Sequence, residues 1–421
     1  MEREAYSKVT WHIVPLLMFA YAAAYLARVN IGLAKLQMLG DLHLSEAVYG
    51  LGAGIFFIGY LIFEVPSNLL LHRIGARVCI ARIMFLWGIV SSCTMFVSSA
   101  WSFYLLRFLL GAAEAGFFPG IVLYLTYWYP SRRRARTTAL FMTSLPLSGL
   151  IGNPISGWIL QSMEGWHGLA GWRWMFFLEG LPSIAIGVVV LFVLKDRISD
   201  APWLSGPEKA LLTERLAADA AESEQVSSIR STISNGYIWL MTVIYFLLAT
   251  GLYGISFWLP TFVKAAGVTS VLKIGLLTAI PFIFSAVCML AVSHSSDRLR
   301  ERRWHIVLPS LAAAIALVVS IHAGHNLTVA IAALTIATMG VFTTIPLFWS
   351  LPTALLAGSG AAVGIALINS LGNVSGFVSQ SLMGWLSTVT HSTHSSIYFL
   401  GASAIAAALL VLAVPARMVN K

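Results

Sequence analysis

Long apolar stretches, separated by short polar ones, cover almost the whole chain. A helix needs about 20 residues to cross roughly 30 Å of hydrocarbon, and the chain holds twelve stretches of about that length. They cover residues 11–34, 47–71, 77–97, 101–129, 137–161, 173–194, 236–262, 272–293, 305–322, 327–349, 359–385 and 396–416. The alternating pattern of a membrane-spanning strand is absent, and in lipid such stretches satisfy their backbone hydrogen bonds only as helices. The pattern predicts an all-α membrane protein with twelve transmembrane helices.

One polar segment, residues 195–235, interrupts this pattern and collects many of the charged residues. Within it, the sequence from Ser205 to Glu208 and the residues up to 221 are typical of a capped amphipathic helix that lies on a membrane surface. Six spans precede the segment and six follow it. We therefore expect an N-terminal six-helix bundle over residues 1–194, a cytoplasmic linker over 195–235 and a C-terminal six-helix bundle over 236–421.

The composition agrees with this class, since 58% of the residues are hydrophobic and only 10% are charged. Soluble domains carry about 45–50% apolar and about 25% charged residues, and disordered chains are less apolar still, so both classes are excluded. The cysteines, Cys79, Cys93 and Cys288, form no C-x-x-C motif and have no histidine pair near them. They fit neither a disulfide framework nor a zinc site, and no metal or cofactor is expected.

The basic residues are distributed unevenly about these spans. With a cytoplasmic N-terminus, 20 of the 26 Lys and Arg residues fall in cytoplasmic connections and 4 on the opposite side, while Arg28 and Arg107 lie within spans. Such a bias sets orientation in a membrane, so we expect both termini in the cytoplasm and the protein in the inner (plasma) membrane. The net charge of +9 then reflects topology and contact with lipid headgroups, and not a nucleic-acid interface.

The two halves of the chain resemble each other. Residues 152–158 of the fifth span, GNPISGW, correspond to residues 372–376 of the eleventh, GNVSG. The basic turn after the second span, residues 72–77, corresponds to the basic turn after the eighth, residues 297–303. Chance similarity of glycine-rich helices would also explain these matches, because small residues let helices approach closely in any membrane protein. A parallel six-plus-six repeat is typical of carriers that bind their substrate between two bundles.

Charged side chains inside the spans need a reason, because a charge at the bilayer centre costs about 2.5–3.5 kcal/mol on insertion scales. Arg28 lies six residues from the end of its span near residue 34, and Arg107 lies six residues from the start of its span at residue 101. At 1.5 Å per residue, both are expected about 9 Å inside the outer end. Glu114 follows Arg107 by seven residues, about 10 Å further inward on the same helix face.

Two guanidinium groups at one depth, with a carboxyl group below them, predict an anion site coupled to a protonatable group. Arginine stays charged and binds a carboxylate through two parallel hydrogen bonds. Protonation of Glu114 would remove its charge and free an arginine for the substrate. A fixed ion pair that joins helices would explain Arg107 and Glu114 as well. For Glu64 a structural or gating role is favoured, and Glu179 is expected to pair with Arg173.

Further polar or amphipathic side chains at membrane depth are candidates to complete the cavity. They are Tyr25, Tyr60, Tyr253, Trp349, Asn153 and Asn369. Each is also compatible with a contact that only packs helices. Arg28 and Arg107 indicate an anion, and the polar residues favour a hydroxylated acid, while an aromatic carboxylate stays open.

Four motifs carry a resemblance to a known family. They are YLARVNIGLA at residues 25–34, EVPSN at 64–68, LRFLLGAAEAGFFPG at 106–120 and GWRWMFFLEG at 171–180. Over essentially the whole chain, the sequence resembles the anion:cation symporter family of the major facilitator superfamily. Within that family it is most similar to the tartrate and sugar-acid branch, which is related to galactonate and glucarate transporters.

The resemblance implies a major facilitator fold and uptake of organic anions together with protons. It implies that Glu114 carries the coupling proton and that Arg107 is its partner. It also implies substrate contacts at Arg28, Tyr60, Trp349 and Asn369.

Two departures from the family pattern bear on the mechanism. Where the family has Tyr-Leu-Asp-Arg in the first span, with the acid taking part in proton coupling, this chain has Ala27, which predicts weaker or altered coupling with substrate binding retained. In the turn after the second span, His72 stands where the superfamily usually has Asp. The gating ion pair expected at Arg73 is therefore in doubt, while Asp297 and Arg298 preserve it in the other half.

We therefore expect a secondary active transporter, not an enzyme, that takes up a tartrate-like dicarboxylate or a sugar acid with a proton by alternating access. The alternative is a facilitated uniporter or exchanger of an organic or aromatic carboxylate, with proton coupling impaired by Ala27. A membrane hydrolase is disfavoured and an ATP-driven pump excluded, because H-E-x-x-H, G-x-S-x-G and any Gly-Lys dipeptide are missing. A non-transporting sensor on the same fold stays open. The expected partners are the anion, the proton and the bilayer, with the monomer as the functional unit.

Overall fold

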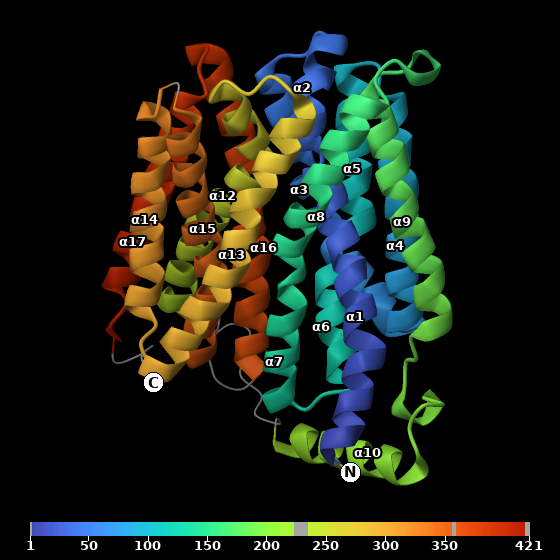
Figure 1. The fold of residues 1–421 in the computed structure, drawn as a ribbon. Coiled ribbons are helices and arrows are strands. Elements are labelled where there is room, and N and C mark those ends of the chain that lie inside the picture. Colours follow the sequence, from blue (N-terminus) through green and yellow to red (C-terminus); the bar gives the residue numbers. More distant parts are fainter. Residues whose placement is uncertain (1, 223–234, 325, 356–358, 417–421) are drawn as a thin grey trace.

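The computed structural model describes residues 2–222, 235–324, 326–355 and 359–416, which form long helices joined by short connections (Figure 1). The helices before the polar segment are α1 (Glu2–Val29), α2 (Ile31–Asp41), α3 (Glu46–Ile74), α4 (Ala76–Cys93), α5 (Ala100–Glu114), α6 (Phe117–Thr126), α7 (Ser131–Met142), α8 (Ser144–Ser162) and α9 (Gly171–Val193). The polar segment contains α10 (Gly206–Glu222). The helices after it are α12 (Gly236–Ala265), α13 (Val271–Leu299), α14 (Arg303–His322), α15 (Leu327–Leu355), α16 (Ser359–Thr390) and α17 (His394–Ala413).

These helices confirm the predicted fold class. Within the described residues, ten helical stretches are long and apolar enough to cross a membrane. The α7–α8 pair and α16 run alongside them and correspond to the fifth and eleventh predicted spans (Figure 1). The boundaries predicted for the two bundles, at residues 194 and 236, stay predictions, and part of the predicted linker, residues 223–234, lies outside the described residues.

Three of the predicted spans are not single helices. The first is interrupted at Asn30, the fourth at Ala115 and Gly116, and the fifth at Thr143. The second break has a local cause, because Gly116 has φ +84°, a left-handed conformation that glycine adopts without steric cost. The first two breaks place helix ends at membrane depth next to Arg28 and Glu114.

The two halves of the molecule meet at the end that lies away from both termini in Figure 1. There α3 packs against α16 and α8 against α13, and glycines bring the backbones together. A Cβ atom on Gly50 would lie 2.8 Å from the Cα atom of Gly384, and one on Gly157 would lie 3.2 Å from the Cα atom of Gly275. Small residues permit this approach in membrane helices, and no side chain needs to fill the contact.

A buried cation reinforces the same end. The Lys35 ammonium group of α2 lies 2.5 Å from a carboxylate oxygen of Glu46 and 3.5 Å from the ring centre of Trp258 in α12. The Trp258 indole N–H donates to the side-chain oxygen of Gln380 in α16 at 2.8 Å. The contact therefore joins helices of both halves. We call the region around these residues and glycines the closed end; its members are Lys35, Glu46, Gly50, Gly157, Trp258, Gly275, Gln380 and Gly384.

At the opposite end α10 lies against the start of α1 (Figure 1). Lys8 donates to Glu208 at 2.7 Å, and the Trp203 ring stacks on His12 with 4.4 Å between ring centres. Glu208 also accepts from the backbone N–H of Ser205, which caps the first turn of α10. The helix predicted in the polar segment is thus present and attached to the N-terminal half.

Candidate functional site

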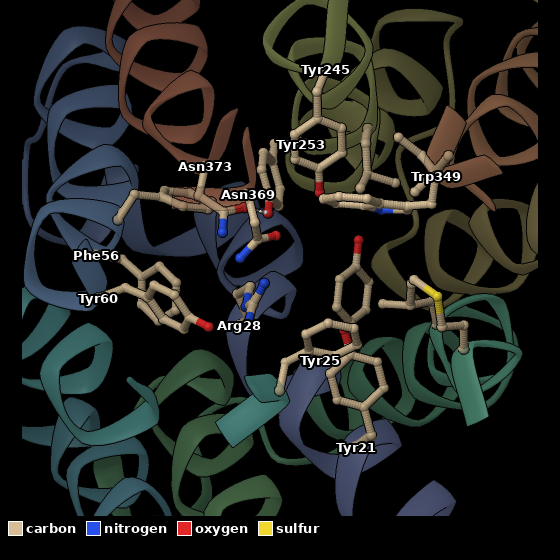
Figure 2. Close-up of a pocket in the computed structure, with 16 residues that line it drawn as sticks. Tyr21, Tyr25, Arg28, Phe56, Tyr60, Tyr245, Tyr253, Trp349, Asn369 and Asn373 are labelled. Carbon is tan, nitrogen blue, oxygen red and sulfur yellow. Dashed lines mark hydrogen bonds between the residues drawn. The ribbon is translucent and has the colours of Figure 1, made fainter. Parts of the chain in front are cut away.

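A cavity of about 60 Å³ lies between the two halves (Figure 2). The N-terminal half contributes Tyr21, Tyr25, Arg28, Phe56, Phe57, Tyr60, Phe118, Met142 and Leu145. The C-terminal half contributes Tyr245, Leu252, Tyr253, Ile345, Trp349, Asn369 and Asn373. Five of the six predicted substrate-binding residues with aromatic or amide side chains therefore line one cavity, and Arg28 lies among them.

Arg28 occupies the centre of this cavity in Figure 2. It belongs to the last turn of α1, and its guanidinium group donates to a carboxylate oxygen of Glu114 at the end of α5. Its guanidinium carbon lies 5.3 Å from the ring centre of Phe56 and 5.9 Å from that of Tyr60. Cations interact favourably with aromatic faces at these distances. Two helix ends and two rings of α3 thus fix the position of the guanidinium group.

This pairing differs from the predicted one. Arg107 was expected to hold Glu114, but the Glu114 carboxylate pairs with Arg28, and none of the three Arg107 side-chain nitrogens has a hydrogen-bond partner within the described part of the chain. Arg107 is only 1% exposed and lies over the Phe56 ring at 5.1 Å. The reason is the seven-residue spacing, since two helical turns separate the residues by about 10 Å along the axis. The end of α1 reaches Glu114 instead.

The wall formed by the C-terminal half combines amides and rings. The Tyr253 hydroxyl donates to the side-chain oxygen of Asn373 at 2.7 Å, and Asn369 points toward Arg28 in Figure 2. The Trp349 and Tyr245 rings pack against each other with 4.8 Å between their centres. Two polar contacts cross between the halves near the cavity: Tyr25 with Ser256, 2.7 Å between oxygens, and Ser370 to Glu64 at 3.0 Å.

Asn153 and Glu179 have positions other than those expected. Asn153 does not line the cavity, and its amide donates to the Gly149 carbonyl of its own helix at 2.8 Å, so it has the packing role that the sequence left open. Glu179 was expected to pair with Arg173. It accepts instead from Asn30 at 2.9 Å and Ser156 at 2.5 Å.

The predicted gating residues lie at the end near the termini. Asp297 pairs with Arg302 at 2.5 Å, whereas Arg298, the expected partner, is exposed. Arg73 is exposed, and no ion pair to it is found among the residues that the structure describes. The ion pair of Asp297 is thus formed with Arg302 in the connection after α13, and the gating role of these residues stays a prediction.

Sequence reasoning missed several residues of the cavity, among them Tyr21, Tyr245 and Asn373. The signal for Tyr21 was present, because Tyr21, Tyr25 and Arg28 follow the i, i+4, i+7 spacing of one helix face. Asn369 and Asn373 are likewise four residues apart. Polar and aromatic residues that repeat at helical spacing inside a span thus indicate which residues line the cavity.

A second cavity, of about 80 Å³, shows where the first one leads. It shares Met142, Leu145, Leu252 and Ile345 with the first and continues to Met289 of α13. This residue lies in the half of α13 that approaches the end near the termini. Space between the halves thus extends from the site away from the closed end.

Comparison with known proteins shows which family has this architecture. The sequence matches the Major Facilitator Superfamily over residues 17–380. The chain belongs to that superfamily. It is therefore a membrane transporter and not an enzyme, and its two bundles enclose the cavity where transporters of this arrangement bind their substrates.

Relatives and solved structures agree with this assignment. The chain is 49% identical over 417 residues to the putative metabolite transport protein NicT of Pseudomonas putida, covering 99% of this chain and 95% of that protein. It is 46% identical over 413 residues to a putative tartrate transporter of Agrobacterium vitis, covering 98% and 95%. A crystal structure of a D-xylose–proton symporter matches with a TM-score of 0.77 at 15% identity, covering 98% of this chain and 99% of that one, which shows the same fold.

Proposed function

We propose that this protein takes up a small organic anion together with a proton, by alternating access between its two bundles. The observation that carries the proposal is the Arg28 guanidinium group, which lines the interface cavity and is held there by the carboxylate of Glu114. An anionic substrate is the natural second partner of a cation in such a site. The sequence predicted a tartrate-like dicarboxylate or a sugar acid, and a relative named as a putative tartrate transporter supports an organic acid.

In this mechanism Glu114 and the substrate carboxylate compete for one guanidinium group. With Glu114 ionised, Arg28 is neutralised and the site has little attraction for an anion. Protonation removes the carboxylate charge, so that Arg28 is free to bind the substrate with two hydrogen bonds. When the site faces the cytoplasm and the proton leaves, Glu114 recaptures Arg28 and expels the anion. Coupling requires that ligand binding differs between the two conformations, since a ligand shifts a conformational equilibrium only by that difference.

Ala27 removes a second carboxyl group from this scheme. It is 1% exposed and stands directly before Arg28, so an acid at this position would provide a further proton carrier. The alternative function, a uniporter or exchanger of an organic or aromatic carboxylate, rests on this single residue. Paired transport assays of the natural chain and Ala27→Asp separate the two: stronger proton-driven accumulation in the variant supports impaired coupling in the natural chain, and equal accumulation contradicts it.

The remaining expectations become part of the same proposal. Tyr25, Tyr60, Tyr253, Trp349 and Asn369 surround the bound anion. At the end near the termini, Asp297 with Arg302, together with Arg298 and Arg73, takes part in gating. The protein acts as a monomer in the inner membrane with both termini in the cytoplasm.

The test uses Glu114→Gln in proteoliposomes. Labelled tartrate, galactonate and benzoate are offered in two assays, exchange against unlabelled acid and accumulation driven by an inward proton gradient. We expect Glu114→Gln to retain exchange and to lose at least tenfold in gradient-driven accumulation, because the amide cannot release a proton. Glu214→Gln, an exposed position on α10, serves as the control and is expected to behave as the natural chain. Accumulation by Glu114→Gln at the natural level would refute the proposed proton site.

A further inference from the structure

We infer that the transported acid is a flat aromatic monocarboxylate, whose ring lies against Trp349 and Tyr245 while its carboxylate binds Arg28. The inference rests on the proposed function and narrows its substrate class. It departs from the tartrate-like and sugar acids that the sequence favoured. Three features of the cavity support it: the surface of its walls, the number of its cations and the position of its amides.

Aromatic side chains dominate the walls. Nine of the sixteen lining residues are Phe, Tyr or Trp. Rings of the two halves approach each other, with 4.5 Å between the ring centres of Phe57 in α3 and Tyr253 in α12, and Trp349 packs with Tyr245 at 4.8 Å. Aromatic pairs at such distances gain affinity beyond the area that they bury. The planar ring of a substrate can therefore stack on these aromatic side chains, whereas an aliphatic substrate cannot.

Two of the tyrosine hydroxyl groups in the walls are already engaged. The Tyr25 hydroxyl is engaged with Ser256 and the Tyr253 hydroxyl with Asn373, each at 2.7 Å. A substrate hydroxyl group at either position would have to replace one of these hydrogen bonds, so it would add little to the affinity there.

The number of cations limits the substrate to one carboxylate. Among the described lining residues, Arg28 is the one that carries a positive charge. Arg107 does not line the cavity, because the Phe56 ring lies between 5 and 6 Å from both guanidinium carbons and covers it. A second carboxylate would therefore be buried against rings without a cation, which is strongly unfavourable.

The amides indicate how the acid is oriented. Asn369 points toward the Arg28 guanidinium group, whereas Trp349 and Tyr245 lie to one side of it and Tyr21 faces them from α1 (Figure 2). A carboxylate placed between Arg28 and Asn369 would accept hydrogen bonds from both side chains. The ring attached to it would then extend between the α12–α15 rings and Tyr21.

The first experiment compares ligands of the purified natural chain by isothermal titration. Benzoate and cyclohexanecarboxylate share a carboxylate and a similar size but differ in the planar ring. We expect benzoate to bind about two- to twelvefold tighter, the factor that one aromatic contact contributes. Tartrate, galactonate and isophthalate, a benzene dicarboxylate, are expected to bind at least tenfold more weakly than benzoate. Equal binding of benzoate and cyclohexanecarboxylate, or tighter binding of any of the other three acids, overturns the inference.

The second experiment tests whether Trp349 provides the aromatic contact. Trp349→Leu retains an apolar side chain without an aromatic face, so benzoate affinity should fall about fivefold while cyclohexanecarboxylate affinity changes less than twofold. Trp349→Phe should restore most of the loss. Trp385→Leu, at a side chain of α16 that is 54% exposed, is the matched control and should leave both affinities unchanged. Equal losses for both acids in Trp349→Leu would mean that the residue acts only through packing, which contradicts the inference.

Exchange assays distinguish this inference from the function on which it rests. If tartrate or galactonate exchanges across proteoliposomes and benzoate does not, the transport of organic anions stands and the aromatic class is wrong. If none of these acids exchanges, both fail. Exchange of benzoate without exchange of the hydroxylated acids supports both.

Discussion

At the scale of single residues, Arg107 carries a charge that no carboxylate neutralises in the described part of the chain. Its guanidinium group is buried, lies over Phe56 and approaches the Phe257 ring at 6.0 Å. A buried charge without a partner lowers the stability of this conformation. A partner in another conformation of the transport cycle would explain why an arginine stands at this position. Glu114 is the carboxylate nearest to it along α5, and transfer of Glu114 from Arg28 to Arg107 would give each arginine a role in a different step.

Arg107→Met tests this interpretation. Methionine fills a similar volume without a charge, so we expect the melting temperature in detergent to stay the same or rise, by an amount equivalent to roughly 1–4 kcal/mol at most. Proton-driven uptake should nevertheless fall at least tenfold, because Glu114 loses its second partner. Arg107→Lys, which keeps the charge, should retain part of the uptake. A lowered melting temperature together with full uptake would show that Arg107 only stabilises the fold.

The individual site residues were predictable to a limited degree. Arg28 and Glu114 stood out because charges are rare in membrane spans, and Tyr25, Tyr60, Tyr253, Trp349 and Asn369 were found as polar groups at the same depth. Their partners were not predictable, since the contact of Arg28 with Glu114 joins residues 86 positions apart. Spacing along one helix suggested Arg107, and only the three-dimensional arrangement, which brings Arg28 at the end of α1 to Glu114 at the end of α5, decides between the two arginines.

At the scale of helices, the closed end depends on close backbone approach between α3 and α16 and between α8 and α13. A methyl group on Gly50 would meet backbone atoms of Gln380 and Gly384, which cannot rotate away as a side chain could. The contact therefore tolerates no added volume. Because Lys35 and Trp258 join the same region, separation of the halves there must also break their cation–π contact, 3.5 Å between ammonium nitrogen and ring centre.

Gly50→Ala should open this end. We expect the variant to populate a state in which the two halves are further apart there, with longer distances between spin labels placed at positions 43 and 391 in double electron–electron resonance. Gly40→Ala, at the same end but with nothing within 4 Å of the added atom, is the matched control. Unchanged distances in a folded Gly50→Ala protein would show that the contact does not hold the end closed.

The attachment of α10 to α1 should depend on pH. The hydrogen bond from Lys8, with those from Ser205, lowers the pKa of the Glu208 carboxyl group from 4.5 to about 2. Because the pKa is lower in the folded state, the contact stabilises the attachment fully above the ordinary pKa of glutamate, and this stabilisation is lost as the pH falls from about 4.5 to about 2.

Hydrogen exchange of α10, corrected for the intrinsic rate at each pH, checks this. Protection of residues 206–222 should decrease as the pH falls from about 4.5 to about 2, the range between the ordinary and the lowered pKa of Glu208. Lys8→Gln should lower protection already at pH 7, whereas Glu214→Gln on the same helix should not. Protection that is independent of both pH and Lys8 would contradict the assignment.

Most helices were predictable from hydropathy to within a few residues, because a span must be apolar over a set length. The spans predicted at 173–194, 272–293 and 305–322 correspond to α9, α13 and α14. Hydropathy did not predict the helix breaks at Asn30 and Gly116, since apolar residues continue on both sides of each. Such breaks persist in lipid only where neighbouring groups satisfy the backbone and side chains, a property of the packed bundle and not of the segment.

At the scale of the whole molecule, the charge distribution along the chain should set its orientation in the membrane. The described parts of the four connections richest in Lys and Arg lie at the same end as the N-terminus in the fold, in agreement with the positive-inside pattern of the sequence. The carrier arrangement could be inferred from the number and repetition of spans, and the family from the resemblance of four motifs. The closure of one end could not, because it depends on contacts between halves that the sequence records only as scattered glycines.

Reporter fusions test the orientation. Alkaline phosphatase fused after Thr390, between α16 and α17, should be active because that connection is expected outside the cytoplasm. The same enzyme fused after Ala416 should be inactive, and a fluorescent protein at that position should fluoresce. The reverse result would place the closed end in the cytoplasm and would reverse the proposed direction of uptake.

Among the described lining residues, charge is confined to the N-terminal half, while the C-terminal half presents rings, aliphatic groups and the two amides. In a carrier divided in this way, substrate specificity can change in one half while the proton-coupling residues of the other half stay the same. Grafting residues 236–421 of a relative onto this N-terminal half would be expected to transfer the relative's choice of acid while preserving the response to protons. Diversity of substrates among related carriers could then arise by variation in one half of the chain, with the energetics of transport inherited unaltered through the other.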